Sequence, residues 1–176
     1  MTGIWIVLAT YFPLLKNEVI YQATQKHFYV PPEIVPKNKE FSIIIPKINA
    51  NAKVIQGVDP FNPSIYQKAL TQGVAHAKGT SLPGQGGNIF IFSHSSSDFL
   101  TARRYNSIFY LLSKLEPKDE VKIFFEENEF KYGVVSQKIV DPNDLSYLAS
   151  NSDKEILTLM TCWPPGTSLK RLIVQA

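Results

Sequence analysis

The stretch TLMTCWPPGTSLKRLIV, residues 158–174, decides how the rest of the chain is interpreted. An apolar run ends at Cys162, an irregular Trp-Pro-Pro-Gly loop follows, and a second apolar run begins at Arg171. The two runs predict a closing pair of strands. A buried structural cysteine needs no such surroundings. A cysteine nucleophile needs a rigid strand end, an open loop and a nearby positive charge that favours the thiolate.

The composition is that of a globular domain. The 176 residues are 44% hydrophobic and 12% aromatic, which suits one domain with a sizeable core. The net charge of +3 is too small to indicate a nucleic-acid partner, and no segment carries a dense basic stripe. One cysteine excludes an internal disulfide or a cysteine-based zinc cluster, and the histidines lack metal-ligand spacing. We therefore expect no metal and no other cofactor.

Residues 1–40 predict an arm that precedes the domain. The apolar run 3–15 is shorter than the roughly 20 residues that span a bilayer, and no Lys or Arg precedes it. Residues 16–27 have helical polarity, and residues 29–40 form a proline-rich linker. We interpret the run as the remnant of a membrane anchor and expect the arm to attach the domain to a membrane.

Residues 41–176 predict a mostly β domain. Strands are expected over Phe41–Ile48, 52–57, Ile89–Phe92, Val121–Phe125, Ile156–Thr161 and Leu172–Val174. Residues 119–140 predict two strands joined by a turn at Glu126, Glu127 and Asn128. Short helices are expected over 62–73 (capped by Ser64 and stopped by Gly73), 106–115 and 141–150. Many short strands separated by brief helices predict a closed β-barrel of about eight strands.

Three residues combine into a candidate catalytic site. His94 follows one buried strand, Cys162 ends another, and Arg171 begins the last. Strand ends at one rim of a barrel can bring such residues together. Histidine supplies a proton donor and acceptor, cysteine a nucleophile, and arginine a permanent planar cation for a carbonyl oxygen or an oxyanion. Each residue alone is weak evidence, because a lone cysteine is commonly a small buried hydrophobe.

The chain resembles the sortases, the cysteine transpeptidases that attach proteins to bacterial cell walls. TLMTC matches the Thr-Leu-x-Thr-Cys motif, RLIV matches the arginine that opens the final strand, and GNIFIFSHSSSDF resembles the segment that carries the sortase histidine. The segment GVAHAKGTSLPGQGGN is also similar. The resemblance covers residues 40–176. It implies that Cys162 is the nucleophile, His94 the acid/base partner and Arg171 the substrate-positioning or oxyanion residue.

The resemblance carries further expectations about the site. Ser93, Thr161 and Trp163 flank the motif residues and are expected to contact the substrate. Ser93 stands where sortases commonly have glycine, and the short proline-rich loop WPPGTSLK is closer to class D and E sortases than to class A. The family pattern also has a histidine at His76, which is interpreted as site-adjacent or structural. The acidic turn at Glu126, Glu127 and Glu129 resembles calcium sites of some class A members, but is interpreted as solvated.

The implied activity is cleavage of a Leu-Pro-x-Thr-Gly-like sorting signal after threonine. An acyl-enzyme thioester would form and its acyl group would pass to an amine. The implied partners are surface proteins with a C-terminal sorting signal and an amine of peptidoglycan or pilin. The implied location is the bacterial cell membrane, with the catalytic domain extracytoplasmic.

Other functions remain as alternatives. A papain-like peptidase would have its cysteine before its histidine, which is the reverse of the order here. An L,D-transpeptidase would have a histidine just before the cysteine, and none lies near Cys162. A non-catalytic β-barrel used for binding is a further alternative. Its cysteine would be inert toward a methanethiosulfonate.

Overall fold

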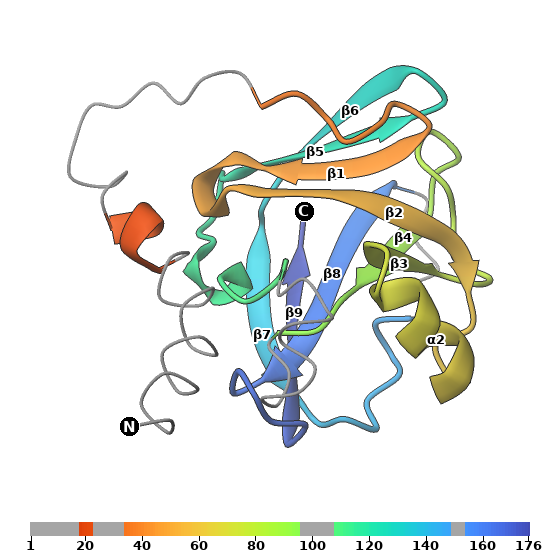
Figure 1. The fold of residues 1–176 in the computed structure, drawn as a ribbon. Coiled ribbons are helices and arrows are strands. Elements are labelled where there is room, and N and C mark those ends of the chain that lie inside the picture. The colour runs from red at the N-terminus through yellow and green to blue at the C-terminus, as the bar shows by residue number, and fades with distance from the viewer. Residues whose placement is uncertain (1–17, 23–33, 96–107, 149–153) are drawn as a thin grey trace, which may run out of the picture.

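The computed structural model describes residues 18–22, 34–95, 108–148 and 154–176. Most of the regular structure among them is β, and Figure 1 shows the strands curled around a common centre. Residues 18–22 are helical, whereas the apolar run 3–15, expected to be an anchor remnant, lies outside the described residues. None of the helices in the described part of the chain is long and apolar enough to cross a membrane.

The described residues form nine strands and three labelled helical segments. The strands are β1 (Phe41–Ile45), β2 (Ala50–Val58), β3 (Val74–Ala77), β4 (Asn88–Phe92), β5 (Glu120–Phe125), β6 (Asn128–Gly133), β7 (Ser136–Val140), β8 (Ile156–Trp163) and β9 (Lys170–Gln175). The helical segments are η1 (Pro46–Ile48), α2 (Pro63–Leu70) and η2 (Leu112–Lys114).

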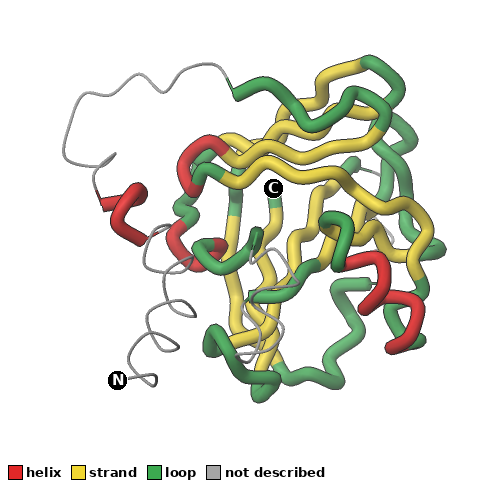
Figure 2. The backbone as a smooth tube through the Cα atoms, in the orientation of Figure 1, coloured by secondary structure: helices red, strands yellow, loops and turns green. Residues whose placement is uncertain are grey.

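The strands belong to one curled sheet. Their hydrogen-bonded order is β6-β5-β1-β2-β3-β4-β8-β9-β7. Only β2–β3 and β4–β8 are parallel, and the other neighbours are antiparallel. The edge strands β6 and β7 follow each other in the chain, so residues 134–135 connect the two edges of the sheet. Figure 2 shows the strands wrapped around the core with the helices at its periphery. The predicted mostly β barrel is confirmed.

Strand β4 is buried on both faces, as its continuous apolar run predicts. Ile89 and Ile91 belong to the core inside the barrel. Phe90 and Phe92 point to the outer face, where they cluster with Leu70 of α2. Helix α2 therefore packs over the outer face of β4, and this packing forms one wall of the site described below.

The first strand is shorter than predicted, because it ends at Ile45 rather than at Ile48. Pro46 has no N–H to continue a ladder of hydrogen bonds, and it begins the 3₁₀ turn η1. Asn49 then adopts a left-handed conformation, with φ 51°, and turns the chain into β2. Residues 119–140 differ as well, since they form three strands rather than two.

Helix α2 is capped by Asn62 and not, as predicted, by Ser64. The Asn62 side chain accepts a hydrogen bond from the backbone N–H of Ile65. Pro63 occupies the first helical position, which proline favours, so the cap must be the residue before it. Ser64 instead donates its hydroxyl hydrogen to Asn62 Oδ1 at 2.7 Å.

Gly73 does not stop the helix, because α2 already ends at Leu70. Its role is at the start of β3. A Cβ atom at this position would collide with the carbonyl oxygen of Lys53 in β2. Glycine therefore allows the backbone of β3 to begin alongside β2.

Two other predicted helices are wrong in the part of the chain that can be judged. Residues 108–115 form turns and the short segment η2. Residues 141–148 form turns only. Asp141 and Asp144 accept hydrogen bonds from the backbone N–H groups of Asn143 and Ser146, both at 3.1 Å. Such local bonds compete with the helical ladder and favour turns.

Candidate active site

Cys162 lies near the end of β8 on the outer face of the barrel. Its register partner across the antiparallel β8–β9 ladder is Arg171. Successive side chains of a strand point to opposite faces. Met160 and Cys162 therefore line the outer cavity, whereas Leu159 packs in the core and Thr161 is buried.

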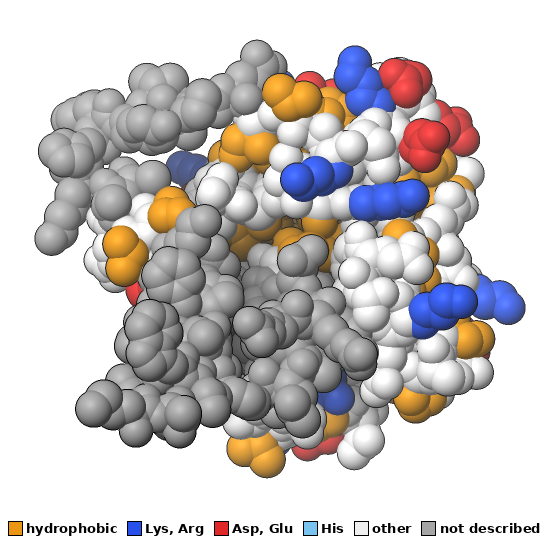
Figure 3. All heavy atoms as spheres, in the orientation of Figure 1, with side chains coloured by type: hydrophobic (Ala, Val, Ile, Leu, Met, Phe, Trp, Pro, Cys, Tyr) orange, Lys and Arg blue, Asp and Glu red, His pale blue; other side chains and the backbone are white. Residues whose placement is uncertain are grey.

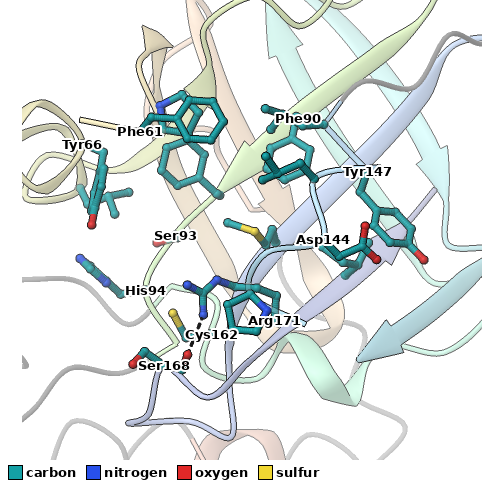
Figure 4. A pocket seen from close by; sticks show the side chains of 18 of the residues that line it. Phe61, Tyr66, Phe90, Ser93, His94, Asp144, Tyr147, Cys162, Ser168 and Arg171 are labelled. Atoms are coloured by element: carbon teal, nitrogen blue, oxygen red, sulfur yellow. Dashed lines mark hydrogen bonds between the residues drawn. The ribbon is translucent and has the colours of Figure 1, made fainter. Parts of the chain in front are cut away.

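Arg171 is the second residue of β9 and its guanidinium lies beside the Cys162 sulfur (Figure 4). Its Nη1 atom donates hydrogen bonds to the carbonyl oxygens of Ser168 and Lys170, both at 3.1 Å. These bonds hold the side chain against the loop that precedes β9. A guanidinium has five N–H donors, so two bonds leave capacity for a substrate oxygen.

His94 lies two residues beyond the end of β4 and is half-buried in the cavity wall. Burial lowers the pKa of His94 from its ordinary value, because the charged imidazolium loses solvation. The neutral ring is thus favoured near neutral pH. In that state it can accept a proton from a thiol and later return it to a leaving group.

The three predicted catalytic residues line one cavity of about 860 Å³. Figure 4 shows the Cys162 sulfur between the His94 imidazole and the Arg171 guanidinium. They come from β8, β9 and the segment after β4, which are neighbours in the sheet. The structure thus brings together the residues that the sequence analysis grouped.

The predicted substrate-contacting residues separate into two groups. Ser93 lines the cavity next to His94. Its φ is not positive, so a side chain is tolerated where sortases commonly have glycine. Thr161 and Trp163 are on the other face of β8. Thr161 is 2% exposed and donates a hydrogen bond to the Ser93 carbonyl oxygen, and Trp163 packs against the barrel core.

His76 lies in β3 and does not line the cavity. It is 3% exposed, and its Nε2 atom lies 2.9 Å from the Ser81 carbonyl oxygen and 3.0 Å from Thr80 Oγ1. Gly57 N–H donates to its Nδ1 atom at 3.4 Å. Burial lowers the pKa of His76. This environment is that of a neutral structural histidine.

The chain matches a known protein family over most of its length. The sequence profile of the Sortase domain family matches residues 43–176. The chain belongs to the sortase family. It is 32% identical over 133 residues to Sortase D of Bacillus subtilis (strain 168), covering 74% of this chain and 59% of that protein. This sortase thus spans little more than half the length of that relative. Sortases are cysteine transpeptidases, so the chain belongs to a family of enzymes.

Solved structures resemble the sortase chain over most of its length. The lid mutant of Sortase A from Corynebacterium diphtheriae superposes with a TM-score of 0.64 at 28% identity, covering 82% of this chain and 72% of that one. A Sortase D5 transpeptidase from Clostridium perfringens has a TM-score of 0.62 at 25% identity, covering 90% and 86%. The shared fold includes the barrel on which the candidate site is built.

The other walls of this sortase's cavity were missed by the sequence analysis. They are formed by the turn before α2, by α2 itself and by the turns of residues 141–148, and their lining includes Phe61, Tyr66, Leu145 and Tyr147. Tyr66 lies in helix α2, whereas Leu145 and Tyr147 lie in turns, and no pattern within either segment marks these side chains as lining one cavity. Phe61, Leu145 and Leu169 are 64%, 51% and 69% exposed, so the rim of the cavity is apolar.

The acidic turn between β5 and β6 forms as predicted, with Glu126 and Glu127 at φ 48° and 67°. Glu129 is ion-paired with Lys122 and Lys131, at 3.4 and 3.6 Å. In Figure 3 several acidic side chains gather at this corner, and others lie elsewhere on the same face. Among the described residues, no group of three or more His, Cys, Asp or Glu side chains is arranged to hold a metal ion.

Proposed function

We propose that the chain is a sortase-type cysteine transpeptidase that cleaves a Leu-Pro-x-Thr-Gly-like sorting signal between threonine and glycine. The observation that carries the proposal is the placement of the Cys162 sulfur between His94 and Arg171 in one cavity. A nucleophile, a titratable base and a fixed cation are the groups that acyl transfer from a peptide requires.

The proposed reaction has two stages. In the first, neutral His94 accepts the proton of the Cys162 thiol, and the resulting thiolate attacks the threonine carbonyl carbon. The guanidinium of Arg171 stabilises the oxyanion of the tetrahedral intermediate. The threonine–glycine C–N bond then breaks, protonated His94 gives its proton to the departing amine, and a thioester remains. In the second stage an amine attacks the thioester carbonyl, His94 accepts the amine's proton, and the Cys162 sulfur departs.

The cavity suits an apolar donor peptide. Its volume of about 860 Å³ lies within the range of ligand pockets, roughly 300–1,000 Å³. Away from the catalytic residues its lining is mainly apolar, with Leu70 from α2, Phe90 and Phe92 from β4, and Leu148 from the turns before β8. The leucine and proline of a sorting signal would bury apolar surface there.

The partners and the location are part of the same proposal. The acyl donors would be surface proteins with a C-terminal sorting signal, and the acceptor an amine of peptidoglycan or pilin. The enzyme would act at the outer face of the bacterial cell membrane, attached through the apolar residues 3–15. Family membership supports this part of the proposal.

The test is trapping of the thioester. The protein is incubated with a sorting-signal peptide that carries a fluorophore and a quencher, with and without a diglycine acceptor. We expect cleavage, a transpeptidation product with the acceptor, and an acyl adduct on Cys162 by mass spectrometry. Cys162→Ala should show no cleavage, no transpeptidation product and no adduct, while its circular dichroism spectrum stays unchanged. Normal cleavage by Cys162→Ala would refute the proposed function.

A further inference from the structure

The regular ladder between β4 and β8 stops just before the catalytic side chains. Its last register pair is Phe92 with Met160. One further backbone hydrogen bond runs from Ser93 N–H to the Met160 carbonyl oxygen, at 3.1 Å. His94 and Cys162 both lie beyond this point. The register of β4 and β8 therefore does not by itself set the position of His94 relative to Cys162.

A side-chain hydrogen bond continues the connection where the register ends. Thr161 Oγ1 donates to the Ser93 carbonyl oxygen at 2.9 Å. That oxygen belongs to the peptide group that joins Ser93 to His94. Because a peptide group is planar, a bond to its oxygen also restrains the backbone nitrogen of His94. Thr161 is covalently joined to Cys162, so this bond links the two catalytic positions by a short path.

The bond lies in an environment where water cannot replace it. Thr161 is 2% exposed and Ser93 is 6% exposed. A buried carbonyl oxygen that loses its partner is left unsatisfied, and the backbone shifts to find another donor. Such a shift would move the His94 backbone, since Ser93 and His94 share the peptide group. Proton transfer between a thiol and an imidazole depends steeply on their separation.

We propose that Thr161 is a positioning residue, whose hydroxyl holds the Ser93 carbonyl and thereby fixes His94 relative to Cys162. The inference rests on the proposed function, because it assigns His94 and Cys162 to one reaction. It replaces the expectation that Thr161 contacts the substrate, since this side chain is on the face of β8 away from the cavity. Its effect should therefore be on kcat rather than on KM.

The same two strands contain a matched control. Thr158 Oγ1 donates to Asn88 Oδ1 at 2.7 Å, and these residues are 0% and 4% exposed. This bond also joins β8 to β4, but Asn88 is at the opposite end of β4 from His94. Thr158→Val removes one buried hydroxyl from the same strand without touching the catalytic end.

The experiment compares Thr161→Val, Thr161→Ser and Thr158→Val in the fluorescent peptide assay, with the melting temperature of each. Thr161→Val should lower kcat by about tenfold to a hundredfold. Its KM should stay within about twofold of wild type. Thr161→Ser keeps the hydroxyl and should restore kcat to within about threefold of wild type. Thr158→Val should lower the melting temperature by a similar amount to Thr161→Val, with kcat within about twofold of wild type.

Three outcomes would overturn the inference. An equal loss of kcat in Thr161→Val and Thr158→Val would show that the Thr161–Ser93 hydrogen bond only stabilises the fold. A rise in KM at constant kcat would return Thr161 to substrate binding. If Thr161→Ser did not restore kcat, the hydroxyl of Thr161 would not be the group that positions His94. If Thr161→Val does not fold, Thr161→Ala makes the same comparison. These outcomes are distinct from failure of the proposed function, which would appear as cleavage by Cys162→Ala.

Discussion

Cys162 and Arg171 are direct cross-strand partners in the antiparallel β8–β9 ladder. Residues opposite each other in such a ladder have Cβ atoms about 4.5–5.5 Å apart. Their separation is therefore set by backbone hydrogen bonds between two strands and not by a flexible loop. His94 is placed differently, because it lies beyond the end of β4.

Arg171→Lys separates the charge of this residue from its shape. Lysine keeps the positive charge but lacks the planar guanidinium, whose Nη1 atom holds the Ser168 and Lys170 carbonyl oxygens and whose other N–H groups could bind an oxyanion. Removal of an oxyanion donor costs about 10²–10³ in kcat, and we expect Arg171→Lys to lose a large part of that range. The measurement is kcat on a sorting-signal peptide.

The alkylation rate of Cys162 against pH is the control for Arg171→Lys. We expect it to stay near wild type, because the substitution keeps a positive charge at position 171. A near-normal kcat in Arg171→Lys would show that the planar shape of the guanidinium is not required. If the alkylation rate of Cys162 fell by as large a factor as kcat, Arg171 would act on the reactivity of the thiol and not on the substrate.

Stability should fall as the pH falls below about 6.5. Burial lowers the pKa of both His76 and His94 from the ordinary value of 6.5. Well above pH 6.5 these rings are neutral in both the folded and the unfolded chain. Below it the unfolded chain binds protons that the folded chain does not, so unfolding is favoured. The urea midpoint, measured from pH 8 to pH 5, reports this loss.

His76→Gln tests the contribution of the structural histidine to that loss. Glutamine does not titrate in this range but can donate and accept hydrogen bonds as His76 does with Ser81 and Gly57. We expect the urea midpoint to depend less steeply on pH between 6.5 and 5 than in the wild type, whatever the absolute stability. An unchanged slope would show that His76 does not account for the acid sensitivity.

Glu155 should contribute to stability through one carboxylate that ties two segments together. Its Oε2 atom accepts hydrogen bonds from the Gly84 and Gly86 N–H groups, at 2.7 and 3.2 Å, and its Oε1 atom accepts from the Tyr132 hydroxyl at 2.6 Å. A hydrogen bond to a charged group contributes about 1.5–3 kcal/mol to the free energy of unfolding. We expect Glu155→Ala to cost about 2–3 kcal/mol of unfolding free energy and Tyr132→Phe about 1–2 kcal/mol.

Denaturant titration of the two single variants and the double variant measures this clamp. Tyr132→Phe removes one of the three bonds and Glu155→Ala removes all of them. The double variant should therefore lose at most about 0.5 kcal/mol of unfolding free energy beyond the loss in Glu155→Ala. Additive losses would mean that Tyr132 stabilises the barrel independently of Glu155.

Deletion of residues 1–30 should leave a folded and active domain. The Sortase domain match begins at residue 43, after the deleted segment. The described contacts that would be lost centre on Lys114, which lies 3.9 Å from a Glu18 carboxylate oxygen and 5.8 Å from the centre of the Tyr21 ring. Contacts of this kind contribute about 1 kcal/mol or less each.

The measurements for the truncated chain are its melting temperature and its kcat. Tyr21→Ala in the full chain is the matched control, because Tyr21 also packs against the barrel core. Both proteins should show a similar small drop in melting temperature and wild-type kcat. A truncated chain that does not fold would show that the arm is an integral part of the domain.

Local sequence patterns predicted most of the strands, and the sequence grouped His94, Cys162 and Arg171, which line one cavity in the structure. The double-faced burial of β4 follows from four consecutive apolar residues, and the β8–β9 pair from two apolar runs around Trp-Pro-Pro-Gly. These features depend on residues close in the chain, so a pattern in the sequence reports them directly. The helix expected over 141–150 was wrong because Asp141 and Asp144 bond to nearby N–H groups, a competition that apolar spacing does not record.

Only the tertiary structure decided which side chains of β8 line the cavity and what surrounds them. The sequence placed Thr161 beside Cys162 as an apparent neighbour of the substrate, but strand alternation turns it toward the Ser93 carbonyl. Tyr66 of α2 and Tyr147 of the turns before β8 reach the cavity of Cys162 although they are distant in sequence. Such a cavity is created by packing between separate segments, and no single segment carries its pattern.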